Sequence, residues 1–428
     1  MYRERGVEMA YSGLNLGNVK NQNRSSILKL LNDHGPMPRK DLSAQLGLTP
    51  ASLTTLCGEL LAQNILFELG EVQQEDKRAG RRKILLGINY AYRHVLSISI
   101  ETPATSVTLC DLRGEHCITR RIPTDTSVEP ELFLKRVANV GKALLWENSI
   151  GREELLGAGV SVPGPVDREK GISTHAYRVW DQPVQVTAPL AEALECTVLL
   201  ENNVKAFAQA ELTYGLGRTE ENLLLLKWGP GVGSAIIAQG RIYESRMYKS
   251  AEIGHVRVEK NGRLCRCGRH GCLETRVASH PIARHLRQVC SPETTPLLWA
   301  AVGGRPENIT VHNLDTLAAL DEPAMWEALD ADIEVLADVV GSCLTMLTPD
   351  HLILYGYMFK LPHFREKFLA ACNRYDPAYD ENYIRVSELA EKLALGMIPE
   401  QKNKKSEEMD AQKKLLEWEQ EYRTRRRQ

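Results

Sequence analysis

Residues 263–274, RLCRCGRHGCLE, place three cysteines within eight positions, and this spacing constrains the local fold more than any other feature of the chain. The two glycines between the cysteines let the backbone curl tightly, so that all three thiols can face one point. Structural zinc takes four ligands of this kind. We therefore predict a structural zinc site with ligands Cys265, Cys267 and Cys272. Three free thiols and a disulfide are the alternatives.

The fourth zinc ligand is expected upstream, in AEIGHVRV, where His255 offers an imidazole. His270 competes, but it lies between the cysteines, where the loop would have to fold back on itself. The other cysteines are scattered, and we expect them to be small buried side chains in a reducing compartment. They are Cys57, Cys110, Cys117, Cys196, Cys290, Cys343 and Cys372.

A chain of 428 residues is too long for one ordinary domain, so two or three are expected. Its net charge of −2 excludes a wholly basic nucleic-acid binder, so any contact with DNA must come from a local patch. No apolar run is long enough for a membrane span or a secretory signal. We therefore expect a cytoplasmic protein.

Residues 15–70 have a helical pattern, and the segments around GLT at 47–49 predict a helix-turn-helix. Thr49 can cap a second helix that begins at Pro50. Strands at 65–69 and 84–88 would flank a basic tip and form a wing. Residues 1–90 are thus expected to be a winged helix-turn-helix that binds DNA; a small domain for protein contacts with a solvated basic loop is the alternative. The candidate DNA contacts are Arg39, Ser52, Thr54, Thr55, Arg81 and Arg82.

From residue 94 onward, apolar strands alternate with helical segments, which predicts an α/β fold. The segment 198–213 is an apolar strand that runs into a helix, and helical patterns fill 280–347. Residues 399–428 are rich in charge and are expected to form a solvated helix or a disordered tail.

The cysteine loop together with AEIGHVRV resembles the signature of the ROK family of sugar-responsive repressors and sugar kinases. The segments GVSVPGPVD and GPGVGSAII also resemble family motifs, and AGRRKILLGIN is similar to the wing of the repressor branch. The resemblance implies an actin/hexokinase-like effector domain over 91–398, with a sugar cleft between two lobes. It implies control of carbohydrate metabolism, with xylose metabolism among the candidates. The sugar-binding residues that it implies are Asn202, Asn203, Glu252, His255 and Glu274.

The same resemblance argues against kinase activity. A kinase of this family has an aspartate where Asn203 stands, and an amide cannot act as the general base. Pro103 removes an N–H from the first phosphate loop, and Tyr357 and Met358 fill a glycine site. Tyr177 stands where family members commonly have an asparagine. We therefore expect no catalytic residue.

Three functions follow from this resemblance and these departures. The first is a repressor that binds operator DNA as a homodimer or a dimer of dimers, and that a sugar or sugar phosphate releases. The second is a DNA-binding regulator with a vestigial sugar cleft. The third is an active sugar kinase.

Overall fold

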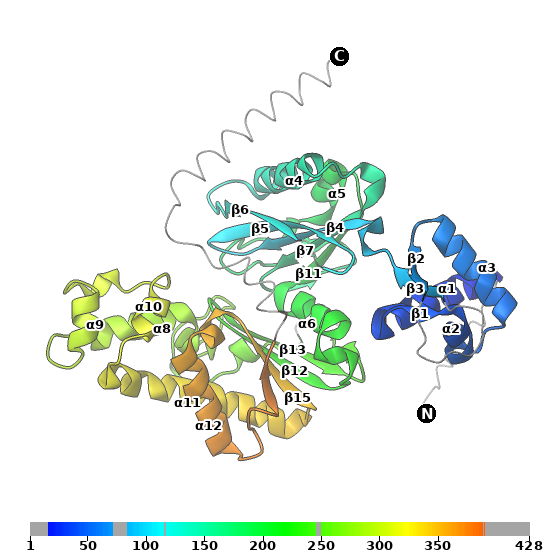
Figure 1. The fold of residues 1–428 in the computed structure, drawn as a ribbon. Coiled ribbons are helices and arrows are strands. Elements are labelled where there is room, and N and C mark those ends of the chain that lie inside the picture. The colour runs from blue at the N-terminus through cyan, green and yellow to red at the C-terminus, as the bar shows by residue number, and fades with distance from the viewer. Residues whose placement is uncertain (1–15, 72–83, 115–116, 245–249, 388, 390–428) are drawn as a thin grey trace, which may run out of the picture. The chain divides into compact units, whose positions relative to one another are not determined.

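The computed structural model describes residues 16–71, 84–114, 117–244, 250–387 and 389 (Figure 1). The chain folds into two compact units. The first unit contains residues 1–95, 110–117 and 153–156, and the second contains the rest. Among the described residues, no helix is both long and apolar enough to cross a membrane.

In its described residues, the first unit has three α-helices and a small antiparallel sheet with the strand order β1-β3-β2. The elements are α1 (Leu16–His34), β1 (Met37–Pro38), α2 (Arg39–Leu46), α3 (Pro50–Ala62), β2 (Leu66–Glu71) and β3 (Ile84–Ile88). These elements agree with the predicted helices and wing strands, but the short strand β1 departs from the helical pattern expected over 15–70. The tail at 399–428 and the tip between β2 and β3 lie outside the described residues.

Local sequence explains the turn between α2 and α3. Gly47 ends α2 with a φ of 63°, a conformation that glycine adopts without strain. The Thr49 hydroxyl then accepts a hydrogen bond from the Ser52 N–H at 3.2 Å and caps α3. Leu42 and Leu53 are fully buried, so both helices are anchored in one core and α3 presents its opposite face to solvent.

The second unit has two α/β lobes. The first lobe is built on a sheet with the order β11-β7-β4-β5-β6, in which β11 and β7 are parallel, and on a small sheet β10-β9-β8. Figure 1 shows α4 and α5 on one face of the larger sheet. The elements are β4 (His94–Ile100), β5 (Ala104–Asp111), β6 (Ile118–Pro123), α4 (Pro130–Glu147), β7 (Leu155–Val162), β8 (Val166–Asp167), β9 (Ile172–Ser173), β10 (Val184–Gln185), α5 (Thr187–Leu194) and β11 (Val198–Asn202).

The second lobe is built on a sheet with the order β14-β13-β12-β15-β16. Helices cover both faces of this sheet, and α11 and α12 pack side by side (Figure 1). The elements are α6 (Asn203–Tyr214), β12 (Leu223–Trp228), β13 (Val232–Ala238), β14 (Arg241–Ile242), α7 (Glu274–Val277), α8 (Ser279–Val289), α9 (Pro296–Ala301), α10 (Leu314–Ala318), α11 (Pro323–Leu347), β15 (His351–Tyr355), α12 (Pro362–Tyr375) and β16 (Ile384–Val386).

Strand β12 explains the run of four leucines in the sequence. Leu224 and Leu226 are buried in the core that α7–α12 form on one face, while Leu223 and Leu225 are buried against α6 on the other. A strand with both faces covered by helices is apolar at every position rather than at alternate positions.

The scattered cysteines depart from expectation in two ways, because Cys196 and Cys343 are only partly buried and one pair is bonded. Cys110 and Cys117 form a disulfide instead of standing as separate thiols. The physical reason is the register of the β5–β6 hairpin, which pairs Leu109 with Ile118 and so brings the next residue on each side together. The other scattered cysteines are free, and Cys57, Cys290 and Cys372 are buried as predicted.

Candidate functional site

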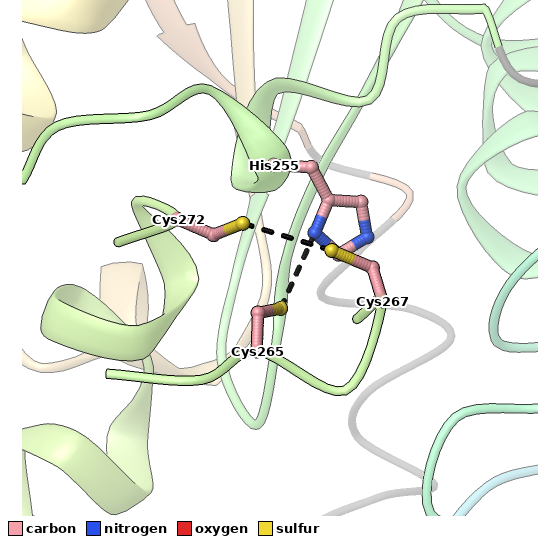
Figure 2. Close-up of side chains that lie close together, drawn as sticks. All are labelled: His255, Cys265, Cys267 and Cys272. Carbon is pink, nitrogen blue, oxygen red and sulfur yellow. Dashed lines mark hydrogen bonds between the residues drawn. The ribbon is translucent and has the colours of Figure 1, made fainter. Parts of the chain in front are cut away.

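The predicted metal ligands converge in the second lobe. His255 ends a short 3₁₀ helix, Ile253–His255, and the three cysteines lie in the loop before α7. One ligand atom from each of His255, Cys265, Cys267 and Cys272 lies within 4.8 Å of all the others. Nδ1 of His255 lies 3.6 Å from Sγ of Cys265, and Sγ of Cys267 lies 3.6 Å from Sγ of Cys272; Figure 2 draws both contacts as dashed lines. In tetrahedral zinc sites with Zn–S bonds of about 2.3 Å, the ligand atoms lie roughly 3.8 Å apart, so the residues fit this ion.

Two glycines with a positive φ shape the cysteine loop. Gly268 has a φ of 83° and Gly271 a φ of 72°. A Cβ on Gly271 would lie 1.7 Å from the backbone oxygen of Glu259, so no other residue fits there without moving the chain. The same fold turns His270 away, where its Nδ1 lies 3.1 Å from the Gly262 carbonyl oxygen, outside the cluster.

The thiols of the cluster lie in unequal environments. Burial raises the pKa of the Cys265 thiol, and the nearby Glu274 carboxylate raises it further. Burial also opposes ionisation of Cys267, but the Arg269 side chain, whose Nε lies 3.4 Å from that sulfur, holds the pKa of Cys267 below its usual range. A dication at the centre would favour the thiolate form of all three.

A cavity in the second unit collects most of the predicted sugar-binding residues. Its lining draws on both lobes and includes Glu101, Asn202, Asn203, Lys227, Glu252 and Glu274. His255 lines an adjoining cavity, and Tyr177 and Glu252 line both.

The two adjacent asparagines in this cavity have different contacts. Asn202 caps α6, because its side-chain oxygen accepts from the N–H groups of Val204 and Lys205, and its amide donates to the Gly164 carbonyl at 2.9 Å. Most of its hydrogen-bonding capacity is therefore used by the protein itself. Asn203 donates its amide N–H to Oε1 of Glu101 at 2.6 Å.

Glu101 also pairs with Lys227, a contact that sequence reasoning missed. The Lys227 ammonium lies 2.8 Å from the same oxygen of Glu101, and both side chains are mostly buried. Burial would raise the pKa of Glu101, but the Lys227 charge and the hydrogen bonds from Lys227 and Asn203 hold it below its usual range. An ion pair therefore lies in the cleft beside Asn203.

The remaining predicted sugar-binding residues, Glu252 and Glu274, lie beside the His255 and Cys265 side chains. Oε2 of Glu252 lies 3.7 Å from Nε2 of His255, and Oε1 of Glu274 lies 3.3 Å from Sγ of Cys265. The Tyr177 hydroxyl lies 3.2 Å from Nε2 of His255, which is the ring nitrogen that faces away from the cysteines. The sequence had placed Tyr177 at an asparagine position of the family, but its contact with His255, 78 residues away, could not be predicted from the sequence.

The candidate DNA contacts divide into two groups. Ser52, Thr54 and Thr55 lie on the exposed face of α3, where the two threonine hydroxyls donate to Pro50 and Ala51 carbonyls in the preceding turn. Arg39 forms an ion pair of 2.8 Å with Glu68 of β2. Arg81 and Arg82 lie outside the described residues.

Comparison with known proteins agrees with this architecture. Residues 95–397 match the sequence model of the ROK family. The chain is 27% identical over 274 residues to the DNA-binding transcriptional dual regulator NagC of Escherichia coli K12, a match that covers 64% of this chain and 66% of that protein. It is 29% identical over 262 residues to a glucokinase of Thermotoga maritima, covering 60% of this chain and 81% of the enzyme.

Among solved structures, a ROK family transcriptional regulator described as a homologue of the E. coli MLC protein superposes with a TM-score of 0.70 at 22% identity. That match covers 86% of this chain and 91% of the other. The two lobes define an actin/hexokinase-like α/β protein. This chain belongs to the ROK family, which includes both transcriptional regulators and sugar kinases.

Proposed function

We propose that this protein is a DNA-binding transcriptional repressor of sugar-metabolism genes, in which a catalytically inactive ROK domain binds a sugar effector. The exposed polar face of α3 carries the proposal. Ser52, Thr54 and Thr55 lie outward on a helix that a tight turn joins to α2, and a strand pair follows, as in a winged helix-turn-helix. Hydroxyl groups of this kind hydrogen-bond to base edges in the major groove.

The comparisons support this assignment of the first unit. The family model begins at residue 95, whereas the match to the solved regulator covers 86% of the chain and must therefore include part of the first unit. A domain used only for protein contacts remains the second interpretation. Arg81 and Arg82 would contact DNA phosphates or the minor groove, and such contacts add affinity without sequence preference.

The chemistry around Asn203 supports an inactive kinase site. Phosphoryl transfer to a sugar hydroxyl requires a group that takes the proton, and an amide at this position cannot. The nearest carboxylate, Glu101, is held by the Lys227 ammonium and by the Asn203 amide. A base that is ionised but committed to two donors is poorly placed to accept a proton from a ligand.

The cysteine loop would hold zinc as a structural ion. Zinc supplies a rigid centre that fixes the loop from His255 to Cys272 against the cleft, and with it Glu252 and Glu274. With zinc on Nδ1, the Nε2 of His255 carries the proton and can donate a hydrogen bond. The zinc loop would thus position the sugar-binding side chains.

Release from DNA would be a coupling between two sites. A sugar must bind the DNA-incompetent arrangement of the protein more tightly than the DNA-competent one. We propose a homodimer or dimer of dimers, with one recognition helix for each half of a symmetric operator.

Fluorescence anisotropy on DNA from upstream of the gene tests the proposal, with D-glucose, D-xylose, N-acetyl-D-glucosamine and their phosphates added at fixed salt. Sequence-specific binding that one of these compounds releases would establish it. Glu252→Gln should then bind DNA normally but lose release. Absence of sequence-specific binding would refute the repressor, and sugar-dependent turnover of ATP would refute the inactive site.

The second candidate is a DNA-binding regulator with a vestigial sugar cleft. The contact between Tyr177 and His255 is the observation that favours it, because this contact occupies a group that a sugar hydroxyl would use. DNA binding that no sugar relieves would support this function.

A further inference from the structure

The cleft contains an aromatic side chain that already makes the contact expected of a ligand. Tyr177 belongs to the β9–β10 connection of the first lobe, and His255 belongs to the second lobe. Their contact at 3.2 Å therefore joins the two lobes across the cleft. The Tyr177 ring also meets the His255 ring edge-on, with the ring centres 5.5 Å apart.

The backbone around Tyr177 is built to hold the ring in this place. The Tyr177 N–H donates to the Pro163 carbonyl at 3.1 Å, and Ala176 pairs with Trp180 to close a tight turn. Arg178, the next residue, has a φ of 68°, a backbone conformation that is unfavourable for residues other than glycine. Such strain persists only where surrounding contacts impose it.

Gly164 packs closely against the Tyr177 ring. It has a φ of 98°, and a Cβ added there would lie 3.1 Å from two ring carbons of Tyr177 and 2.4 Å from the His175 carbonyl oxygen. Because Gly164 has no side chain, the backbone of the Pro-Gly loop at residues 163–164 packs directly against the Tyr177 ring. The ring also meets His175 edge-on, with ring centres 4.8 Å apart.

The Tyr177 hydroxyl also gives Nε2 of His255 a hydrogen-bond partner. With a metal ion on Nδ1, the Nε2 of His255 would carry the proton, and the Tyr177 oxygen at 3.2 Å would accept it. A tyrosine hydroxyl is neutral near pH 7 and can both donate and accept a hydrogen bond. A neutral hydroxyl on an aromatic carbon is chemically close to the hydroxyl of a sugar.

We propose that Tyr177 is an internal competitor for the sugar: its hydroxyl occupies the hydrogen-bonding position on Nε2 of His255, and an effector must displace it to bind. The proposal rests on the sugar-binding function given above. It assigns Tyr177 as the residue that sets effector affinity, and it makes the contact between Tyr177 and His255 a property of the sugar-free state. Because Tyr177 lines both cavities, its displacement would join them into one larger site.

The test measures sugar affinity by isothermal calorimetry on the full-length zinc-loaded protein, with D-glucose, D-xylose and N-acetyl-D-glucosamine as probes. Tyr177→Phe removes only the hydroxyl and should tighten binding of at least one probe by about fivefold to tenfold, the value of one net hydrogen bond. Tyr177→Asn removes the ring as well and should tighten it further. Tyr243→Asn is the matched control, because Tyr243 is 54% exposed and does not line either cavity.

Zinc content and DNA binding, measured on the same samples, separate the outcomes. If Tyr177 only orients His255 for the metal, Tyr177→Phe will lower zinc retention and leave sugar affinity unchanged, which overturns the proposal. If no variant binds any probe while DNA binding persists, the cleft is not a sugar site and the proposal fails. If the Tyr177 variants bind sugar more tightly but no sequence-specific DNA binding is found, the proposal for Tyr177 is supported and the proposed repressor function is refuted.

Discussion

Nζ of Lys227 lies 2.8 Å from Oε1 of Glu101, so that strand β12 of one lobe is tied across the cleft to the residue that follows strand β4 of the other. Asn203 donates to the same oxygen from the first turn of α6. Three elements that are distant in sequence thus meet at one carboxylate. Any ligand that changes the separation of the lobes must also change this contact.

The ion pair predicts a pH dependence of stability. The pKa of Glu101 is below its ordinary value of 4.5 in the folded protein, so its ionised form stabilises the fold. That stabilisation is fully present above about pH 4.5 and is lost as pH falls through the lower folded value. Glu101→Gln should cost about 1–3 kcal/mol near neutral pH and flatten the acid side of the profile. Thermal unfolding between pH 7 and pH 3 measures both effects.

The control for this prediction is an exposed pair of the same chemistry. Lys135 and Glu131 on α4 are paired at 2.8 Å but are largely solvent-exposed. Lys135→Met should leave the unfolding temperature unchanged, because exposed ion pairs contribute little. Equal effects of Lys135→Met and Lys227→Met would contradict a special role for the buried pair.

The metal site predicts a loss of zinc on removal of one ligand. Cys272→Ser should lose the ion and lower the unfolding temperature, because a structural metal contributes its binding free energy to folding. His270→Ala should retain the metal, since His270 lies in the same loop but outside the cluster. Elemental analysis should give about one zinc for each wild-type chain. A chelator without effect on thermal stability would count against the assignment.

The Asn203→Asp substitution tests whether the inactive site can be restored by one residue. We expect no sugar-dependent ATP turnover, because the new carboxylate would lie beside Glu101, at the position where the Asn203 amide nitrogen now lies 2.6 Å from Oε1. Two carboxylates so close repel each other and raise one pKa. The variant should therefore unfold at a lower temperature than wild type at pH 8. A coupled ATPase assay with the three sugars checks the first part, and turnover would show that only the base was missing.

The exposed face of α3 predicts base readout. Thr55→Ala should weaken binding to the operator by about 1–3 kcal/mol and relax sequence preference at one position of each half-site. Thr213→Ala is a matched control, because the Thr213 hydroxyl on α6 donates to the carbonyl four residues earlier, as that of Thr55 does. Anisotropy titrations on operator and scrambled DNA measure the difference. Equal weakening on both DNAs would indicate that Thr55 contacts only the backbone of the duplex.

The sequence predicted features that depend on neighbouring residues. The helices around Gly47 and Pro50 follow from capping and turn chemistry, and the cysteine loop follows from ligand spacing within eight residues. The structure places His255 beside the three cysteines and His270 outside that cluster, in the arrangement that the choice of His255 as a ligand requires.

Contacts between distant elements could not be predicted in the same way. The pairing of Glu101 with Lys227 spans 126 residues and that of Tyr177 with His255 spans 78, and each depends on how two lobes close on one cavity. The Cys110–Cys117 disulfide depends on the register of a hairpin, which a shift of one residue would change. Asn202 was predicted to bind sugar; in the structure its side-chain oxygen caps α6 and its amide N–H donates to the Gly164 carbonyl, contacts that the sequence did not reveal.

Gly271 makes the metal site vulnerable at a residue that binds no metal. The backbone oxygen of Glu259 occupies the space where any side chain at 271 would begin. A missense change there would leave all four candidate ligands in place in the sequence and would still be expected to disrupt binding of the proposed zinc ion. The space beside residue 271 would thus constrain substitution in this loop as strictly as the need for sulfur and nitrogen ligands does.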